Sequence, residues 1–91
     1  MIVTLEKTKE WLRVESGDED ELIESFITAA EDIVGGILRF PLSEFEQVPE
    51  TVKQAIYYAV SVMYEQRESL DIVALMNTLR GMLFVYRKDE W

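Results

Sequence analysis

The 91-residue chain is both apolar and strongly acidic: 48% of its residues are hydrophobic, and 18 Asp and Glu against 9 Lys and Arg give a formal net charge of −9. It contains no Cys and no His, which excludes disulfides, thiol nucleophiles, Cys-ligated metals and His-based catalytic triads. A free monomer of this charge should be repelled by nucleic acid and by anionic membranes. The length fits one domain, residues 1–91, with a modest core.

The chain shows no targeting or membrane-spanning segment. Its first apolar residues run directly into Glu6 and Lys7, without the apolar stretch of a signal peptide. The longest apolar run, residues 55–60, is far shorter than the ~20 residues needed to cross a bilayer. We therefore expect a protein that is made and kept in a cytoplasm-like compartment.

The first half of the chain predicts two helices. Thr4 is a suitable N-cap for a helix over residues 5–13, and Gly17 then breaks the pattern. A second helix is expected over residues 18–38, capped by Ser16, Gly17 or Asp18. Four acidic residues in its first turn, 18–21, would complement the helix dipole. An EF-hand is excluded because Leu22 stands where that motif needs Asp or Asn, so we expect no metal site.

The second half predicts two more helices. Pro49 is typical of a helix start, and apolar residues recur at i, i+3 and i+4 over residues 49–68. After a polar break, Ser69 or Asp71 can cap a last helix over residues 73–84, and an extended tail from Val85 onward completes the chain. No segment alternates as a strand would. The predicted fold is all-α, a small bundle of about four helices with an extended C-terminal tail.

The chain has more large apolar side chains than a small helical domain can easily bury. Three tyrosines at 57, 58 and 64 could form a stacking platform for bases, but the Lys and Arg residues that such a platform needs are missing, which favours core or subunit contacts. We therefore expect an interface between subunits. Its predicted residues are Trp11, Tyr57, Tyr58, Phe84, Tyr86, Arg87 and Trp91.

Three segments together carry a family resemblance. The first runs from Leu5 through Leu12-Arg13-Val14 to the acidic group 18–21. The strongest is Val48-Pro49-x-x-Val52-Lys53-x-Ala55-Ile56, followed by Tyr64-Glu65-x-Arg67-Glu68, and the last is Leu79…Tyr86-Arg87. In this order the chain resembles the head–tail connector (adaptor) family of tailed bacteriophages, also described as possible DNA-packaging proteins. It departs from the family at Val85, where members typically have Pro.

The resemblance implies a small helical bundle without enzymatic activity or cofactor. It implies a homo-oligomeric ring of about twelve copies at the virion head–tail junction, where the partners are the portal protein and a tail-side connector protein. DNA would pass through the ring without specific binding, and no membrane is involved. A negatively charged lumen would let DNA slide. The acidic residues predicted to face the lumen are Asp18, Glu19, Asp20, Glu21 and Glu24.

Other functions remain open on the residues alone. An acidic binding module, which mimics DNA or sequesters a basic partner, would have the same charge. A helix-turn-helix DNA binder would need a basic recognition helix, which none of the four predicted helices provides. An enzyme is disfavoured because neighbouring carboxylates such as Glu31 and Asp32 do not face one another on a helix.

Overall fold

The structure is a computed structural model that describes residues 2–86. Each of the four helices predicted from the sequence is present in it. The helices are α1 (Leu5–Leu12), α2 (Asp20–Leu38), α3 (Glu50–Glu65) and α4 (Ile72–Leu83), with a short 3-10 helix, η1 (Leu42–Glu44), between α2 and α3. The described part contains no strand, so the predicted all-α class is confirmed. None of its helices combines the length and the apolar character needed to cross a bilayer.

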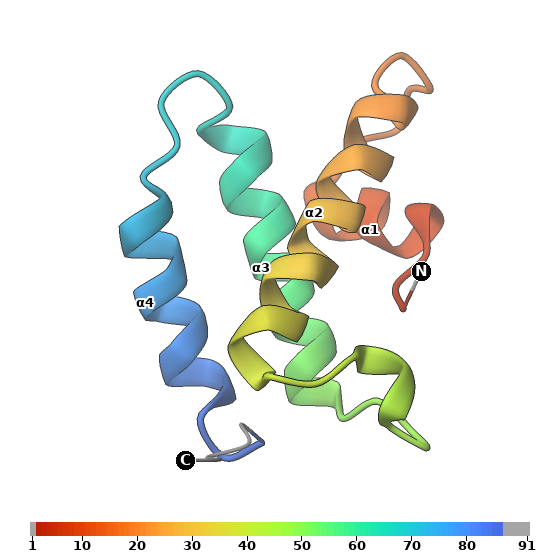
Figure 1. Ribbon diagram of the computed structural model, residues 1–91. Helices are drawn as coiled ribbons and strands as arrows, with labels where there is room; N and C mark the ends of the chain where they lie inside the picture. The colour runs from red at the N-terminus through yellow and green to blue at the C-terminus, as the bar shows by residue number, and fades with distance from the viewer. Residues whose placement is uncertain (1, 87–91) are drawn as a thin grey trace.

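The helices form a layered bundle in which α2 and α3 cross at the centre (Figure 1). α4 runs antiparallel along the outer side of α3, while α1 lies on the other side of the α2–α3 pair (Figure 1). The core fills the space between them and is formed almost entirely by aliphatic side chains. Its fully buried members include Ile23, Ile27, Val34, Leu38, Val52, Ile56, Val60, Leu79 and Leu83.

The helix ends follow the expected chemistry except at α2. Thr4 Oγ1 accepts a hydrogen bond from the Lys7 backbone N–H at 3.1 Å, and the Asp71 carboxylate accepts one from the Ala74 N–H at 3.1 Å. These two predicted caps are confirmed. The prediction that Ser16, Gly17 or Asp18 caps α2 is wrong: the N-cap is Glu19, and its side chain makes no capping bond. Its carboxylate instead binds residues of another segment, as described below.

The N-terminal segment and the connection between α2 and α3 are both held against the bundle. The Glu31 carboxylate accepts hydrogen bonds from the backbone N–H groups of Ile2 and Val3 at 2.7 and 3.1 Å, which places the N-terminal segment beside α2. In the α2–α3 connection, Leu42 is buried and Phe45 is half-buried. This connection is therefore a packed part of the fold.

The chain leaves α4 through a turn in which the Tyr86 N–H donates to the Leu83 carbonyl at 3.0 Å. The rest of the predicted extended tail, from residue 87 onward, lies outside the described residues.

Candidate functional site

The outward-facing side of α4 carries apolar side chains that nothing in the described chain covers. Leu75, Leu79 and Leu83 face the core, and a row of exposed positions on another side of the helix follows a spacing of i, i+4, i+7 and i+11. We call these positions the α4 stripe. Its two ends are the most exposed large apolar residues of the described part, with 66% exposure at Val73 and 70% at Phe84. The stripe consists of Val73, Asn77, Arg80 and Phe84.

The α4 stripe also differs from the rest of the molecule in charge. Residues 72–86 include no Asp or Glu and one basic residue, Arg80, in a chain with 18 acidic residues. The Arg80 guanidinium donates to the Asn77 side-chain oxygen at 3.3 Å, and no carboxylate of the described part forms an ion pair with it. The stripe is therefore an apolar, slightly positive edge on a strongly negative protein.

A groove of about 370 Å³ lies between α2 and α4, next to this stripe. Its lining is mixed, with apolar side chains beside two arginines, one from the C-cap of α2 and one from α4. The groove could hold a large apolar side chain that is accompanied by a carboxylate. It is lined by Ile33, Gly36, Ile37, Arg39, Met76 and Arg80.

The opposite side of the molecule carries an aromatic pair, which we call the aromatic edge. The rings of Trp11 on α1 and Tyr57 on α3 are stacked, with centroids 5.1 Å apart and planes inclined by 13°. Trp11 remains 43% exposed, and burial raises the pKa of Tyr57, helped by the charges of Glu50 and Glu10. The aromatic edge is thus an apolar surface with carboxylates beside it.

Two other predicted interface residues that the structure describes, Tyr58 and Tyr86, do not join these surfaces. Tyr58 is exposed, but it lies one position beyond Tyr57, about 100° further round α3, and is not part of the stack. Tyr86 is half-buried, with its ring edge-to-face with Phe45 at a centroid distance of 6.4 Å. Arg87 and Trp91 lie outside the described residues. Of the five predicted residues that the structure describes, it stacks only Trp11 and Tyr57 on one another.

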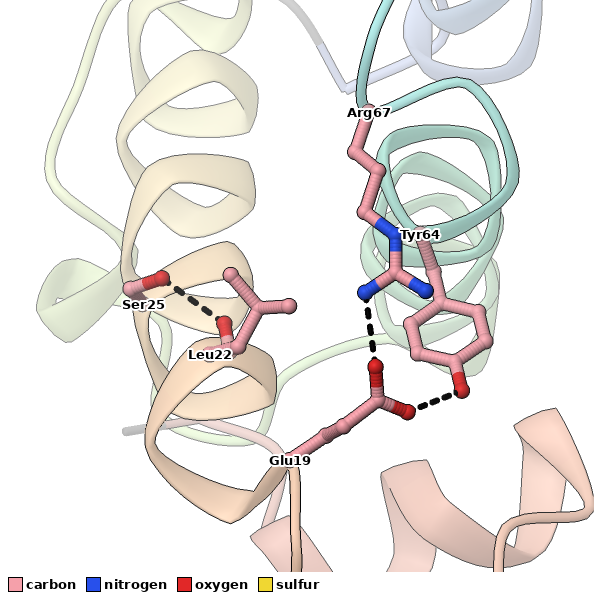
Figure 2. Close-up of polar contacts among 5 residues, drawn as sticks. All are labelled: Glu19, Leu22, Ser25, Tyr64 and Arg67. Atoms are coloured by element: carbon pink, nitrogen blue, oxygen red, sulfur yellow. Dashed lines mark hydrogen bonds and ion pairs between the residues drawn. The ribbon is translucent and has the colours of Figure 1, made fainter.

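Two of the five acidic residues predicted to face a lumen are held by contacts within the chain. Figure 2 shows the Glu19 carboxylate between Tyr64, from the last turn of α3, and Arg67, from the loop after it. The Tyr64 hydroxyl donates to this carboxylate at 2.5 Å, and the Arg67 guanidinium donates to it at 2.7 Å. We call this group the Glu19 clasp. Asp20 accepts from the Lys9 ammonium at 2.7 Å. Asp18, Glu21 and Glu24 are exposed.

The clasp changes the titration of all three of its members. The Tyr64 and Arg67 hydrogen bonds hold the pKa of Glu19 below its usual range. The hydrogen bond to the Glu19 carboxylate raises the pKa of Tyr64, and burial is the second cause of this shift. The hydrogen bond to the same carboxylate raises the pKa of Arg67. The Arg67 guanidinium also lies 4.9 Å from the centroid of the Tyr64 ring. These side chains join the start of α2 to the end of α3 and the loop that follows it.

Val73 and Arg80 were not among the interface residues predicted from the sequence. The spacing of 73, 77, 80 and 84 on one helix face, in a segment without acidic residues, could have indicated them. Within residues 2–86, no three acidic side chains lie close enough together to hold a metal ion.

The comparisons with known proteins gave one match, to a protein family. The sequence matches the family described as phage gp6-like head-tail connector protein over residues 2–87, which is nearly the whole chain. Comparisons with curated proteins and with solved structures gave no match. Because the match extends from the segment before α1 to the turn after α4, the chain belongs to the family of phage gp6-like head-tail connector proteins.

Proposed function

We propose that copies of this chain assemble into a closed ring at the head–tail junction of a tailed phage. The ring joins the portal protein of the DNA-filled head to a tail-side connector protein and leaves a channel for DNA. The observation that carries the proposal is the family match over residues 2–87. The role is structural, without a chemical reaction or a cofactor.

The surfaces of the molecule support assembly. A ring of identical subunits needs two different patches on each copy, which meet head to tail and close by rotation. The α4 stripe and the aromatic edge are two such patches. The helices α4 and α1, which carry the stripe and Trp11, lie on opposite sides of the α2–α3 pair (Figure 1). Each exposes large apolar side chains, which favour burial against a partner.

The charge of the chain supports the role of a conduit. DNA binds proteins largely by exchanging its counterions for Lys and Arg side chains, and this chain carries twice as many acidic as basic residues. Asp18, Glu21 and Glu24 remain our candidates to face the lumen, because they are exposed. We retain Glu19 and Asp20 as part of the same acidic surface, although their carboxylates are already paired within the chain.

The test combines imaging with genetics. We expect purified protein, alone or with the portal protein, to form rings in negative-stain images and a multiple of the subunit mass in light scattering. Phage that lacks the protein should accumulate heads and tails that are not joined, and the wild-type gene should restore joining. Particles that assemble and join normally without the protein would refute the proposed function. Displacement of DNA from a basic partner by a monomer would favour the acidic binding module instead.

A further inference from the structure

The exposed face of α4 is complementary to itself when the helix is turned end to end. We propose that two free copies of the chain pair through this face, with their α4 helices antiparallel, as a two-fold symmetric dimer. The partner of the α4 stripe in the free protein is thus the α4 stripe of a second copy. This dimer concerns the protein before assembly and does not depend on the ring proposed above.

The first argument is the order of side chains along the α4 stripe. In a two-fold contact, a residue that meets a second residue of the partner is itself met by that second residue. Val73 and Phe84 stand at the two ends of the stripe, and Asn77 and Arg80 stand between them, with both pairs centred between residues 78 and 79. Reversal of the helix therefore places apolar against apolar and amide against guanidinium. Asn77 already accepts a hydrogen bond from Arg80 within the chain at 3.3 Å, so the two groups match chemically.

The second argument is a pair of small residues beside the stripe. Ala74 and Gly81 are exposed, and they are centred within one residue of the same point of α4. A glycine weakens a helix, and a Cβ added at Gly81 would meet nothing within 4 Å, so the fold of one chain does not require a glycine there. In the antiparallel pair, Gly81 of one copy lies opposite Ala74 of the other. Small residues at this point let the two backbones approach closely.

The third argument is charge. Two copies that each carry a formal charge of −9 repel one another over most of their surfaces, but residues 72–86 contain no acidic side chain. Glu68 and Asp71 precede α4, and Asp71 caps the helix through one carboxylate oxygen. Arg80 lies in the last turn, and Arg87 and Lys88 follow in the sequence. An antiparallel pair places the acidic start of each helix near the basic end of the other, whereas a parallel pair would place like charges together.

The position and length of α4 determine what kind of dimer this is. α4 lies at one edge of the bundle, so two copies joined at α4 extend away from one another (Figure 1). The helix has 12 residues and is therefore about 18 Å long, so the contact is short and the dimer is weak. A weak dimer covers the apolar face of α4 in the free protein and can release it to another contact during assembly.

Cross-linking tests the antiparallel arrangement, and the chain has no cysteine of its own. Asn77 lies near the two-fold axis, so we expect Asn77→Cys alone to give a dimer with a short bismaleimide. Val73→Cys alone should give little product, because the two copies of this residue lie 11 residues apart along the pair, about 16 Å. A mixture of Val73→Cys and Phe84→Cys should give the heterodimer. The double variant Val73→Cys/Phe84→Cys should stop at the dimer, since a two-fold contact uses both positions.

A matched pair of glycine variants tests the close approach of the helices. Gly81 and Gly36 are both exposed helical glycines at which an added Cβ would meet nothing within 4 Å. Glutamine is a better helix former than glycine, so Gly81→Gln and Gly36→Gln should both melt no lower than the wild type. We expect Gly81→Gln to raise the Kd of the dimer by about tenfold in sedimentation equilibrium, because its side chain is forced between two backbones. Gly36→Gln should leave the Kd unchanged.

The antiparallel dimer is refuted if the wild type remains a monomer at its highest soluble concentration, or if Val73→Cys alone cross-links as well as Asn77→Cys. Trimers and larger species from the double variant would show that the contact joins two different surfaces. Equal Kd values for the two glycine variants would also refute the pairing. Failure of the genetic test of head–tail joining would refute the proposed function and leave the dimer standing.

Discussion

The Glu19 carboxylate joins two segments that are distant in the sequence. It sits at the N-cap of α2, and its partners Tyr64 and Arg67 come from the last turn of α3 and the connection beyond it. The partners are 45 and 48 residues away along the chain. Because the group is largely open to solvent, we expect its stabilisation to be modest and to depend on pH and salt.

Acidification should weaken the fold partly through this clasp. The pKa of Glu19 is lower in the folded chain than in the unfolded chain, so its stabilisation is complete above the usual range of a glutamate and is lost as the pH falls through the lowered pKa. We expect the urea midpoint of the wild type to fall more between pH 7 and acid pH than that of Glu19→Gln. Glu24→Gln, which removes an exposed carboxylate, should keep the wild-type pH dependence. Equal slopes for wild type and Glu19→Gln would contradict the role of the clasp.

Truncation of a core side chain should lower the free energy of unfolding far more than truncation of a side chain in the α4 stripe. Ile56 is completely buried in α3, so Ile56→Ala should cost about 2–5 kcal/mol of unfolding free energy through lost contacts and a cavity. Val73→Ala, at a largely exposed position, should change it by less than about 0.5 kcal/mol. Denaturant titration measures both values. Equal costs would show that the core is placed wrongly. Tyr64 is half-buried, so truncation there also reports on the clasp.

At the level of elements, α4 is attached to the bundle along one face. Leu75, Leu79 and Leu83 hold it to the core, and much of its remaining surface is exposed. Its sequence is not optimised for helix stability, because Gly81 lies inside the helix at a position where an added Cβ would meet nothing within 4 Å. Nothing in the described chain requires a glycine there.

Gly81→Ala should therefore stabilise the isolated chain by about 1 kcal/mol, since alanine loses less backbone entropy in a helix than glycine does. Gly36→Ala in α2 is the matched variant, because a Cβ at Gly36 would also meet open space. Chemical denaturation of both variants at a concentration where the protein is monomeric provides the measurement. Destabilisation by Gly81→Ala would mean that the α4 backbone is not a regular helix at this point.

At the level of the whole molecule, net charge opposes assembly. Copies with a formal charge of −9 repel one another, and this repulsion acts over the Debye length, about 30 Å at 10 mM salt and about 8 Å at 150 mM. Ion pairs between exposed side chains of neighbouring copies are also screened by salt, but each is a small favourable contribution against a large repulsive field.

We therefore expect self-association to become stronger as salt rises from about 10 to 150 mM. Sedimentation velocity over a concentration series measures the change. Association that weakens steadily with salt would indicate that ion pairs, rather than apolar burial, hold the copies together.

The helices could be predicted from the sequence because their signals are local. The expected ranges of 5–13, 18–38, 49–68 and 73–84 lie within three residues of the observed ends, and the caps at Thr4 and Asp71 were identified. Apolar periodicity depends on neighbours three and four positions away, and a capping side chain reaches only to the next turn. The all-α class and the family resemblance follow from this local information.

The pairing of distant side chains was decided by the tertiary structure alone. The acidic start of α2 suggested five equivalent carboxylates, but the bundle brings Tyr64 and Arg67 to Glu19 and Lys9 to Asp20. It likewise turns Tyr86 onto Phe45 and leaves Phe84 exposed. The physical reason is that apolar periodicity shows only which face of each helix is buried. The way the helices cross decides which faces meet, and therefore which polar side chains come together at the edge of each contact.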